Sequence, residues 1–271
     1  MTSYFTDIAS DALTRFQWHF VQLVEEGDVL YLWLNNPERR NALNPIMLNE
    51  LAYALAYFQA KASLRFLRLR AKGEVFCAGA DLRGFAEDIP HHSTVPKAEK
   101  PLIPQELFAE IDKPILAEVT GRVIAGGVLL LTEATFVIAH QGVEVSLPEI
   151  HRGLFPFQVM KALAAYMPPR LALHWCLLGG RRSAAELHAY HLVTHLVDKA
   201  EEVFPAGDRL LEALREGAPL AMQKGIYAYR RLAQMEPAEL YKLLMELALS
   251  EDAREGLQAF LEKRKPQWKG R

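Results

Sequence analysis

The sequence predicts a mixed α/β fold with a parallel sheet, and two observations point to it. From Ile115 onward the chain reads as strand, glycine turn, helix and strand, over residues 115–121, 122–127, 128–134 and 135–140. Strands that alternate with helices favour a parallel sheet with right-handed crossovers. After Ala162 the apolar pattern becomes almost entirely helical up to Arg264, so we expect helices to dominate that end of the chain.

The elements before Ile115 are predicted from shorter patterns. Residues 1–16 form a polar and apolar extension, and residues 19–35 contain two alternating apolar runs around Gly27, which predicts a β-hairpin. Residues 46–60 have apolar side chains at helical spacing, and Asn44-Pro45 is a typical helix start.

Residues 65–72 alternate as a strand. The stretch 85–105 mixes charges with several prolines and histidines, namely Pro90, His91, His92, Pro96 and Pro101. Such a composition predicts a mobile loop or a broken helix. The chain has no repeat, low-complexity tract or clear linker.

Composition narrows the class of protein. The chain has 271 residues, of which 51% are hydrophobic, enough for one large domain with a sizeable core. Its net charge of −2 gives no field that favours nucleic acid or a membrane surface. The two cysteines, Cys77 and Cys176, lie far apart without a metal-ligand spacing; they could pair, but nothing demands it, so a reducing cytosol is the simplest interpretation. The N-terminus does not resemble a signal peptide, and no apolar run reaches the roughly 18 residues of a membrane span, so we expect a cytoplasmic protein.

Two glycine turns carry the strongest local signal for a functional site. Residues 73–85 run from an apolar stretch through Ala78-Gly79-Ala80-Asp81 into a helical pattern, and a second turn occurs at Gly126-Gly127. Small residues let backbone approach a ligand closely, and free N–H groups at a helix start favour a negative oxygen. Two such turns could present two N–H groups to one carbonyl oxygen, as in an oxyanion hole. Either turn alone is more commonly a tight strand-to-helix connection.

Six segments extend this signal over most of the chain. They are RRNALN at 39–44, FCAGADLRGF at 76–85, KPILAEVTGRVIAGG at 113–127, SLPEIHRGLFP at 146–156, GRRSAAELHAYHLVTHLV at 180–197 and SEDAREGLQAFLEKRKPQWKG at 250–270. In this order and spacing they resemble the crotonase family, also called the enoyl-CoA hydratase/isomerase superfamily. Each segment is a weak motif, whereas all six in order are highly specific.

The resemblance implies a fold, a substrate class and an assembly. The fold is the crotonase (ClpP-like) spiral of ββα repeats, with a core in residues 1–200, of which 1–16 are an N-terminal extension, and a C-terminal helical trimerisation region in residues 201–271. The substrate is an acyl thioester of coenzyme A, with no separate cofactor and no metal. The assembly is a homotrimer or a hexamer built as a dimer of trimers.

Individual positions match the motifs of the family. The oxyanion donors fall on the backbone N–H groups of Ala80 and Gly126. The positions that bind coenzyme A fall on Arg40, Ala42, Leu43, Ala78 and Arg83. In the tail, Phe260 and Lys263 match positions that close over the nucleotide, often across a subunit boundary. Basic side chains suit phosphates by charge, although Arg40 and Arg83 taken singly are equally typical of ordinary surface charge.

The acid/base positions depart from those of the two-glutamate hydratases that the sequence resembles. In those enzymes one glutamate follows the glycine turn and a second lies in a later Pro-Glu pair; here Glu149 supplies the second and Leu129 occupies the first. Two carboxylates hold and deprotonate a water well, whereas one is sufficient to move a proton between C2 and C4 of an enoyl thioester. We therefore predict Glu149 as the sole acid/base residue of an enoyl-CoA isomerase, with its pKa raised by burial beside Leu129 and Phe157.

Other functions and residues remain open. The chain could hydrate or dehydrate an enoyl-CoA, dehydrate a polyketide thioester on a carrier protein, or bind acyl-CoA or RNA without catalysis, although the net charge does not support RNA. Glu133 follows Leu129 by four residues and could replace the missing carboxylate. Weaker candidates are Glu118, Glu144, His140, His151 and Cys77.

Overall fold

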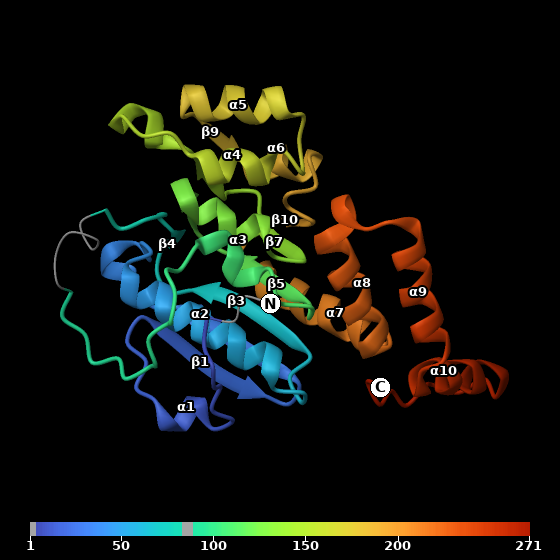
Figure 1. The fold of residues 1–271 in the computed structure, drawn as a ribbon. Helices are drawn as coiled ribbons and strands as arrows, with labels where there is room; N and C mark the ends of the chain where they lie inside the picture. Colours follow the sequence, from blue (N-terminus) through green and yellow to red (C-terminus); the bar gives the residue numbers. More distant parts are fainter. Residues whose placement is uncertain (1–3, 83–88) are drawn as a thin grey trace.

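A computed structural model of the chain describes residues 4–82 and 89–271 and shows two sheets with helices around them (Figure 1). The larger sheet has the strand order β1-β2-β3-β5-β7-β10. Its strands are β1 (Val21–Glu26), β2 (Val29–Leu34), β3 (Phe66–Ala71), β5 (Ile115–Val119), β7 (Phe136–His140) and β10 (His195–Val197). Only the β1–β2 hairpin is antiparallel within this sheet as described. The predicted mixed α/β class with a parallel sheet is therefore confirmed.

The smaller sheet has the order β4-β6-β8-β9, from β4 (Val75–Cys77), β6 (Arg122–Ile124), β8 (Glu144–Ser146) and β9 (Arg181–Ser183). The first three strands are parallel, and β9 is antiparallel to β8. Because parallel neighbours end at the same edge of a sheet, the segments that follow β4, β6 and β8 come together there.

Helices cover both faces of the larger sheet. Side chains at alternate positions of β2 and β3, such as Leu30 and Leu67, pack into the main core with α2 (Pro45–Ala60). Their sequence neighbours, such as Phe66, face α7 (Val203–Arg215) on the other side. This period of two is the expected pattern for strands buried on both faces. As predicted, Asn44 caps α2, because its side chain accepts a hydrogen bond from the N–H of Met47 at 2.8 Å.

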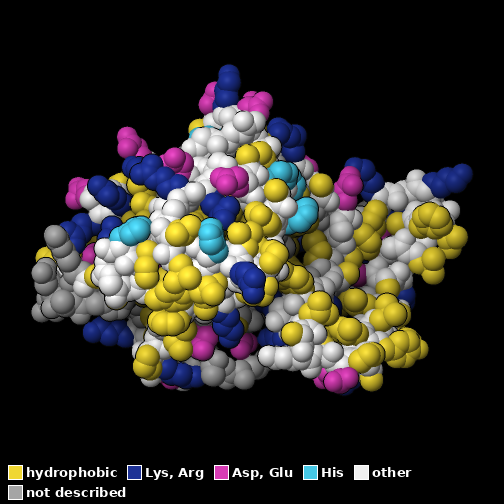
Figure 2. Space-filling model, turned by 90° about the horizontal axis from the view of Figure 1, so that it is seen from above, with side chains coloured by type: hydrophobic (Ala, Val, Ile, Leu, Met, Phe, Trp, Pro, Cys, Tyr) yellow, Lys and Arg dark blue, Asp and Glu magenta, His cyan; other side chains and the backbone are white. Residues whose placement is uncertain are grey.

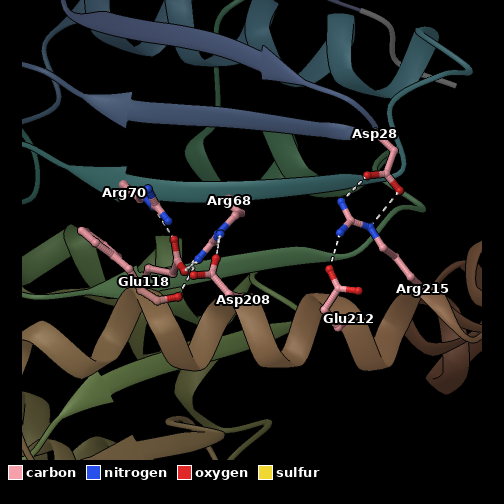
Figure 3. A network of polar contacts seen from close by, with 8 residues as sticks. Asp28, Arg68, Arg70, Glu118, Asp208, Glu212 and Arg215 are labelled. Atoms are coloured by element: carbon pink, nitrogen blue, oxygen red, sulfur yellow. Dashed lines mark hydrogen bonds and ion pairs between the residues drawn. The ribbon is translucent and has the colours of Figure 1, made fainter.

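A buried network of charges joins α7 to the larger sheet (Figure 3). The Arg68 and Glu118 side chains, 1% and 0% exposed, form an ion pair, and Glu118 also pairs with Arg70. Asp208 of α7 pairs with Arg68 from the helix side. A Cβ atom at Gly207 would overlap the Glu118 carboxylate, so glycine lets α7 approach this closely. Glu118, one of the weaker candidates from the sequence, therefore faces α7.

The remaining helices lie mostly in the second half of the chain. They are α1 (Ala12–Arg15), α3 (Val128–Thr132), α4 (Phe157–Leu163), α5 (Pro169–Leu178), α6 (Ala184–Ala189), α8 (Pro219–Arg231), α9 (Pro237–Ala248) and α10 (Glu251–Leu261). Short 3₁₀ helices are η1 (Pro37–Arg39), η2 (Pro104–Phe108), η3 (Ala125–Gly127), η4 (Pro148–Arg152), η5 (Ala200–Glu202) and η6 (Leu232–Gln234).

The prediction of almost pure helix after Ala162 is wrong at two places, β9 and β10. Each strand has three residues, and β9 consists of Arg181, Arg182 and Ser183. Three residues are too few to show an alternating pattern, so the place of each strand in its sheet depends on backbone pairing, of β9 with β8 and of β10 with β7.

The N-terminal extension binds the irregular stretch that precedes η2. Phe5 packs edge-on against Tyr53 of α2, with ring centroids 4.8 Å apart. Gln17 and Thr94 exchange two hydrogen bonds, of 2.9 and 3.0 Å, and the N–H of Glu99 donates to the carbonyl of Tyr4 at 2.9 Å. Residues 89–103 have no helix or strand, as predicted, while residues 83–88 lie outside the described part of the chain and mobility stays a prediction.

Helices α8, α9 and α10 extend to one side of the sheets (Figure 1) and carry many hydrophobic side chains on their surface, visible on the right of Figure 2. The large exposed hydrophobic residues here include Tyr229, Leu232, Tyr241, Leu244, Leu249, Leu257, Phe260 and Leu261. Within residues 4–82 and 89–271, no helix has the length and apolar character needed to cross a bilayer.

Candidate active site

The segments after β4, β6 and β8 line a cavity of about 400 Å³. The structure brings together here six of the predicted site residues: Ala78, Ala80, Gly126, Leu129, Glu149 and Phe157. Leu129 is 4% exposed, and Phe157 lies at the surface with its ring centroid 4.8 Å from that of Phe155. The wall is mostly apolar, as an acyl chain would require.

The two glycine turns touch each other at Gly79. This residue has a φ of 79°, and a Cβ atom there would lie 2.8 Å from the backbone nitrogen of Gly126 and 2.8 Å from Ala125 Cβ. A Cβ atom added to Gly126 would lie 3.8 Å from the backbone nitrogen of Ala80. The turns are therefore close enough for both N–H groups to approach one ligand atom.

The backbone pairing with Leu43 leaves the N–H of Ala80 unused. Leu43 donates to the carbonyl of Gly79 at 2.7 Å and accepts from the N–H of Asp81 at 3.0 Å. Because successive residues of an extended segment point to opposite sides, the N–H of Ala80 points away from Leu43. Gly126 lies in the first turn of η3, where an N–H has no acceptor within the helix. This pair of donors can stabilise a negative oxygen.

Glu149 enters the same cavity from η4, directly after β8. Its Oε2 atom is buried and has no hydrogen-bond partner within the described residues. Burial raises the pKa of Glu149 above its ordinary value, in the predicted direction, and the positive charge of Arg152 partly opposes that rise. A half-buried carboxylate with a raised pKa and an oxygen that has no hydrogen-bond partner is suited to accept and return a proton.

A second cavity of about 610 Å³ adjoins the first and shares Ala80, Leu82 and Arg152 with it. Arg40, a predicted contact of coenzyme A, lines this second cavity. Arg39 lines it too and pairs with Asp81 at 3.5 Å. The lining of this cavity has three arginines, Arg39, Arg40 and Arg152, against two carboxylates, Glu38 and Asp81, and we call it the basic cavity. A cavity with an excess of arginine beside an apolar one suits a substrate with an anionic and an apolar end.

The other residues predicted to bind coenzyme A either have a structural role or lie outside the two cavities. Leu43 is buried and holds the Ala80 segment by the backbone bonds described above. Ala42 donates to the carbonyl of Arg39 at 3.1 Å and lines neither cavity. Arg83 lies outside the described residues. Phe260 is 79% exposed on α10, and neither it nor Lys263, just beyond that helix, lines either cavity.

The interpretation of Glu133 as a replacement carboxylate is wrong. Glu133 follows the last residue of α3 and pairs with Arg230 of α8 at 3.1 Å. It lines a different cavity, of about 540 Å³, between α8 and the core. The ion pair with α8 holds the carboxylate there, although four residues separate it from Leu129.

The weaker candidates also have structural roles or surface positions. Glu144 pairs with Arg181 at 3.2 Å, and His140 Nε2 lies 3.2 Å from the carbonyl oxygen of Thr120. His151 is exposed. Cys77 is fully buried, and burial raises the pKa of its thiol to about 12, so it stays protonated. No group of three His, Cys, Asp or Glu side chains in the described ranges could hold a metal ion.

Sequence reasoning missed Arg152, which lines both cavities. A signal for it exists in the sequence, because Arg152 follows Glu149 by three residues. In a 3₁₀ helix, side chains three residues apart eclipse each other, so this spacing places the guanidinium beside the carboxylate once the turn type is known.

Comparison with known proteins gives consistent matches over the whole site. Residues 25–271 match the enoyl-CoA hydratase/isomerase family. The chain is 31% identical over 263 residues to the carnitinyl-CoA dehydratases of Proteus mirabilis (strain HI4320) and Salmonella typhi, covering 93% of this chain and 98% of each relative.

Solved structures match to a similar extent. An enoyl-CoA hydratase/isomerase from Mycobacterium paratuberculosis superposes with a TM-score of 0.83 and 25% identity, covering 94% of this chain and 100% of that one. An enoyl-CoA hydratase from Mycobacterium tuberculosis H37Rv has a TM-score of 0.81 and 29% identity, with coverages of 93% and 99%.

Proposed function

The chain belongs to the enoyl-CoA hydratase/isomerase family, within the crotonase superfamily, and on this premise we propose that it isomerises an enoyl-CoA thioester with one glutamate. One observation carries the proposal: among the described residues that line the apolar cavity, Glu149 is the only carboxylic acid. Leu129 occupies the position where a second carboxylate would hold a water.

The proposed reaction needs one proton carrier and one oxyanion hole. The thioester oxygen accepts hydrogen bonds from the N–H groups of Ala80 and Gly126. Glu149 takes a proton from C2 of a 3-enoyl thioester, and the electrons of that C–H bond delocalise into a dienolate. The protonated Glu149 then returns the proton to C4, which gives the 2-enoyl thioester without any exchange of water.

We further propose that coenzyme A extends from this cavity into the basic cavity beside it. Arg40 would contact its phosphates there, and Phe260 and Lys263 would close over the nucleotide from a neighbouring subunit of a trimer or a dimer of trimers. The exposed hydrophobic surface of α8, α9 and α10 supports a partner at that end of the chain.

A second candidate is the addition or removal of water at an enoyl-CoA. The carnitinyl-CoA dehydratases that are 31% identical to this chain favour it, because their names describe removal of water from a coenzyme A thioester. In this reaction too, the hole would stabilise an enolate, and Glu149 would carry the proton.

An assay in heavy-oxygen water separates the two candidates. Wild type and Glu149→Gln are compared on 3-enoyl-CoA and 2-enoyl-CoA, with Glu144→Gln as a control because Glu144 is a surface carboxylate on β8. Isomerisation predicts conversion of 3-enoyl to 2-enoyl without label, lost in Glu149→Gln and kept in Glu144→Gln. Rapid uptake of label into a 3-hydroxyacyl product would establish the water-dependent reaction instead.

A further inference from the structure

Arg152 lies beside the proposed base without being part of its chemistry. Both residues belong to η4, three positions apart, and both line the apolar cavity. Side chains at this spacing in a 3₁₀ helix eclipse each other. The guanidinium is therefore close to whichever substrate carbons Glu149 reaches.

The surroundings of Arg152 leave its donors available. It is exposed, and within the described ranges no ion pair or hydrogen bond of its side chain is found. The nearby Arg39 is already paired with Asp81. Around Arg152 the wall of the cavity is apolar, with Leu82, Leu154 and Phe157. A guanidinium at the edge of an apolar cavity is suited to a planar anion that accepts two parallel hydrogen bonds.

We propose that Arg152 binds a carboxylate carried by the acyl chain, so that the enzyme selects acyl-CoA substrates with an anionic acyl group. The inference rests on the proposed function, in which this cavity takes the acyl chain. Arg152 lines both the cavity proposed for the acyl chain and the one proposed for coenzyme A. Because the whole pantetheine arm separates the phosphates of coenzyme A from the thioester, a side chain three residues from Glu149 is nearer to the reacting end of the substrate.

A carboxylated acyl chain needs a positive charge in this cavity. An ionised Glu149 would repel the substrate carboxylate, because charges interact more strongly in an apolar cavity than in water. Arg152 lowers the free energy of both carboxylates, as its opposing effect on the pKa of Glu149 illustrates. An acyl chain with a terminal methyl group gains nothing from the guanidinium.

Binding of two saturated probes tests the proposal without any chemistry. Glutaryl-CoA and valeryl-CoA have acyl chains of equal length that end in a carboxylate and a methyl group. Calorimetry should show that wild type binds glutaryl-CoA more tightly, and that Arg152→Gln loses roughly 10–100-fold in affinity for it while valeryl-CoA changes less than about 3-fold. Arg152→Lys should recover part of the affinity, because it keeps the charge but not the paired hydrogen bonds.

Arg170→Gln is the matched control, because Arg170 is an exposed arginine at the start of α5 that lines neither cavity. It should bind both probes as wild type does. An equal loss for both probes in Arg152→Gln would overturn the proposal, because it would assign Arg152 to coenzyme A. No loss for either would overturn it as well. Failure of the proposed isomerisation shows separately, in the turnover of Glu149→Gln.

Discussion

Gly79 determines how closely the two backbone turns of the cavity approach each other. Alanine there would have an unfavourable positive φ and a Cβ atom 2.8 Å from the nitrogen of Gly126. Because the turn must shift, we expect Gly79→Ala to lower kcat by roughly 10²–10³, the usual effect of losing an oxyanion donor. Steady-state kinetics on the preferred enoyl-CoA measures this.

Gly27→Ala is the control for backbone strain alone. Gly27 has a φ of 61° in the hairpin, and a Cβ atom there meets nothing within 4 Å. This variant should lose some thermal stability and keep its kcat. Equal kinetic losses in both variants would show that the contact with Gly126 is unimportant.

Because of Glu149, activity should rise with pH while the stability of the fold should fall. Since burial raises its pKa above the ordinary 4.5, kcat/KM should fall with acidification at a midpoint above that value. The raised pKa means that the fold favours the protonated acid. The stabilisation from protonated Glu149 is therefore complete below the pKa that the residue has in the unfolded chain. It is lost as the pH rises through the pKa of the residue in the folded protein.

Glu149→Gln should consequently have a higher Tm than wild type at pH 7, with the difference vanishing near pH 4. Thermal unfolding of both proteins across this range measures it. A variant that is less stable than wild type at pH 7 would contradict the view that the buried Oε2 atom is an uncompensated charge.

Site residues were predictable from sequence where backbone or motif order defines them. Ala80, Gly126 and Glu149 each follow a strand of the same sheet, so local motifs were sufficient to place them together. Arg152 was missed because its relevance depends on the 3₁₀ geometry of η4. The pairing of Glu133 with Arg230 was missed because α8 is distant in sequence.

At the scale of helices and strands, the packing of α7 against the larger sheet depends on Glu118. Replacing it with glutamine leaves the nearly buried Arg68 and Arg70 without their shared anion. We expect Glu118→Gln to cost about 3–5 kcal/mol of unfolding free energy, as when one partner is removed from a buried ion pair. Urea unfolding measures this cost. The control is Glu144→Gln, which removes one partner of an exposed ion pair and should cost about 0–1 kcal/mol. Equal costs for the two variants would show that burial of the network adds nothing to stability.

The N-terminal extension should protect residues 89–103 from proteolysis. It lies before the family match, which begins at residue 25. Gln17 forms hydrogen bonds with the backbone and the side chain of Thr94, and Tyr4 accepts one from the N–H of Glu99. Deleting residues 1–17 removes these contacts and should give faster cleavage within 89–103, detected by limited proteolysis and mass spectrometry. Thr94→Val, which removes only one bond, should show a smaller increase, and unchanged cleavage in the deletion would contradict a protective role.

Long elements were predictable and short ones were not. The β1–β2 hairpin and α2 have enough residues for a period to emerge, and α2 also begins at a recognisable Asn-Pro pair. Strands β9 and β10 have three residues each, and only their neighbours β8 and β7 make them strands.

For the whole molecule, the exposed hydrophobic side chains of the C-terminal helices lead us to expect that the chain associates with copies of itself. Leu249 and Leu261 are each 71% exposed, and Phe260 is 79% exposed. Sedimentation equilibrium at micromolar concentration should give three or six times the chain mass of 30.6 kDa. Phe260→Asp should weaken the assembly, because it places a charge in an apolar contact. Val24→Asp, at an exposed position of β1, should leave the mass unchanged, and a monomeric wild type would refute the assembly.

The common end of β4, β6 and β8 has an evolutionary consequence. Each of these strands leads into its own loop, and the loops after β4 and β6 touch each other at Gly79. In the proposed reaction, the loops after β4 and β6 would activate the thioester through main-chain atoms, which are insensitive to most side-chain changes. The loop after β8 presents Glu149 and Arg152 as side chains, which one codon can alter. If the proposed function holds, descendants of this scaffold would diversify in reaction and substrate through the five-residue 3₁₀ helix η4, while the main-chain donors for an enolate stay the same.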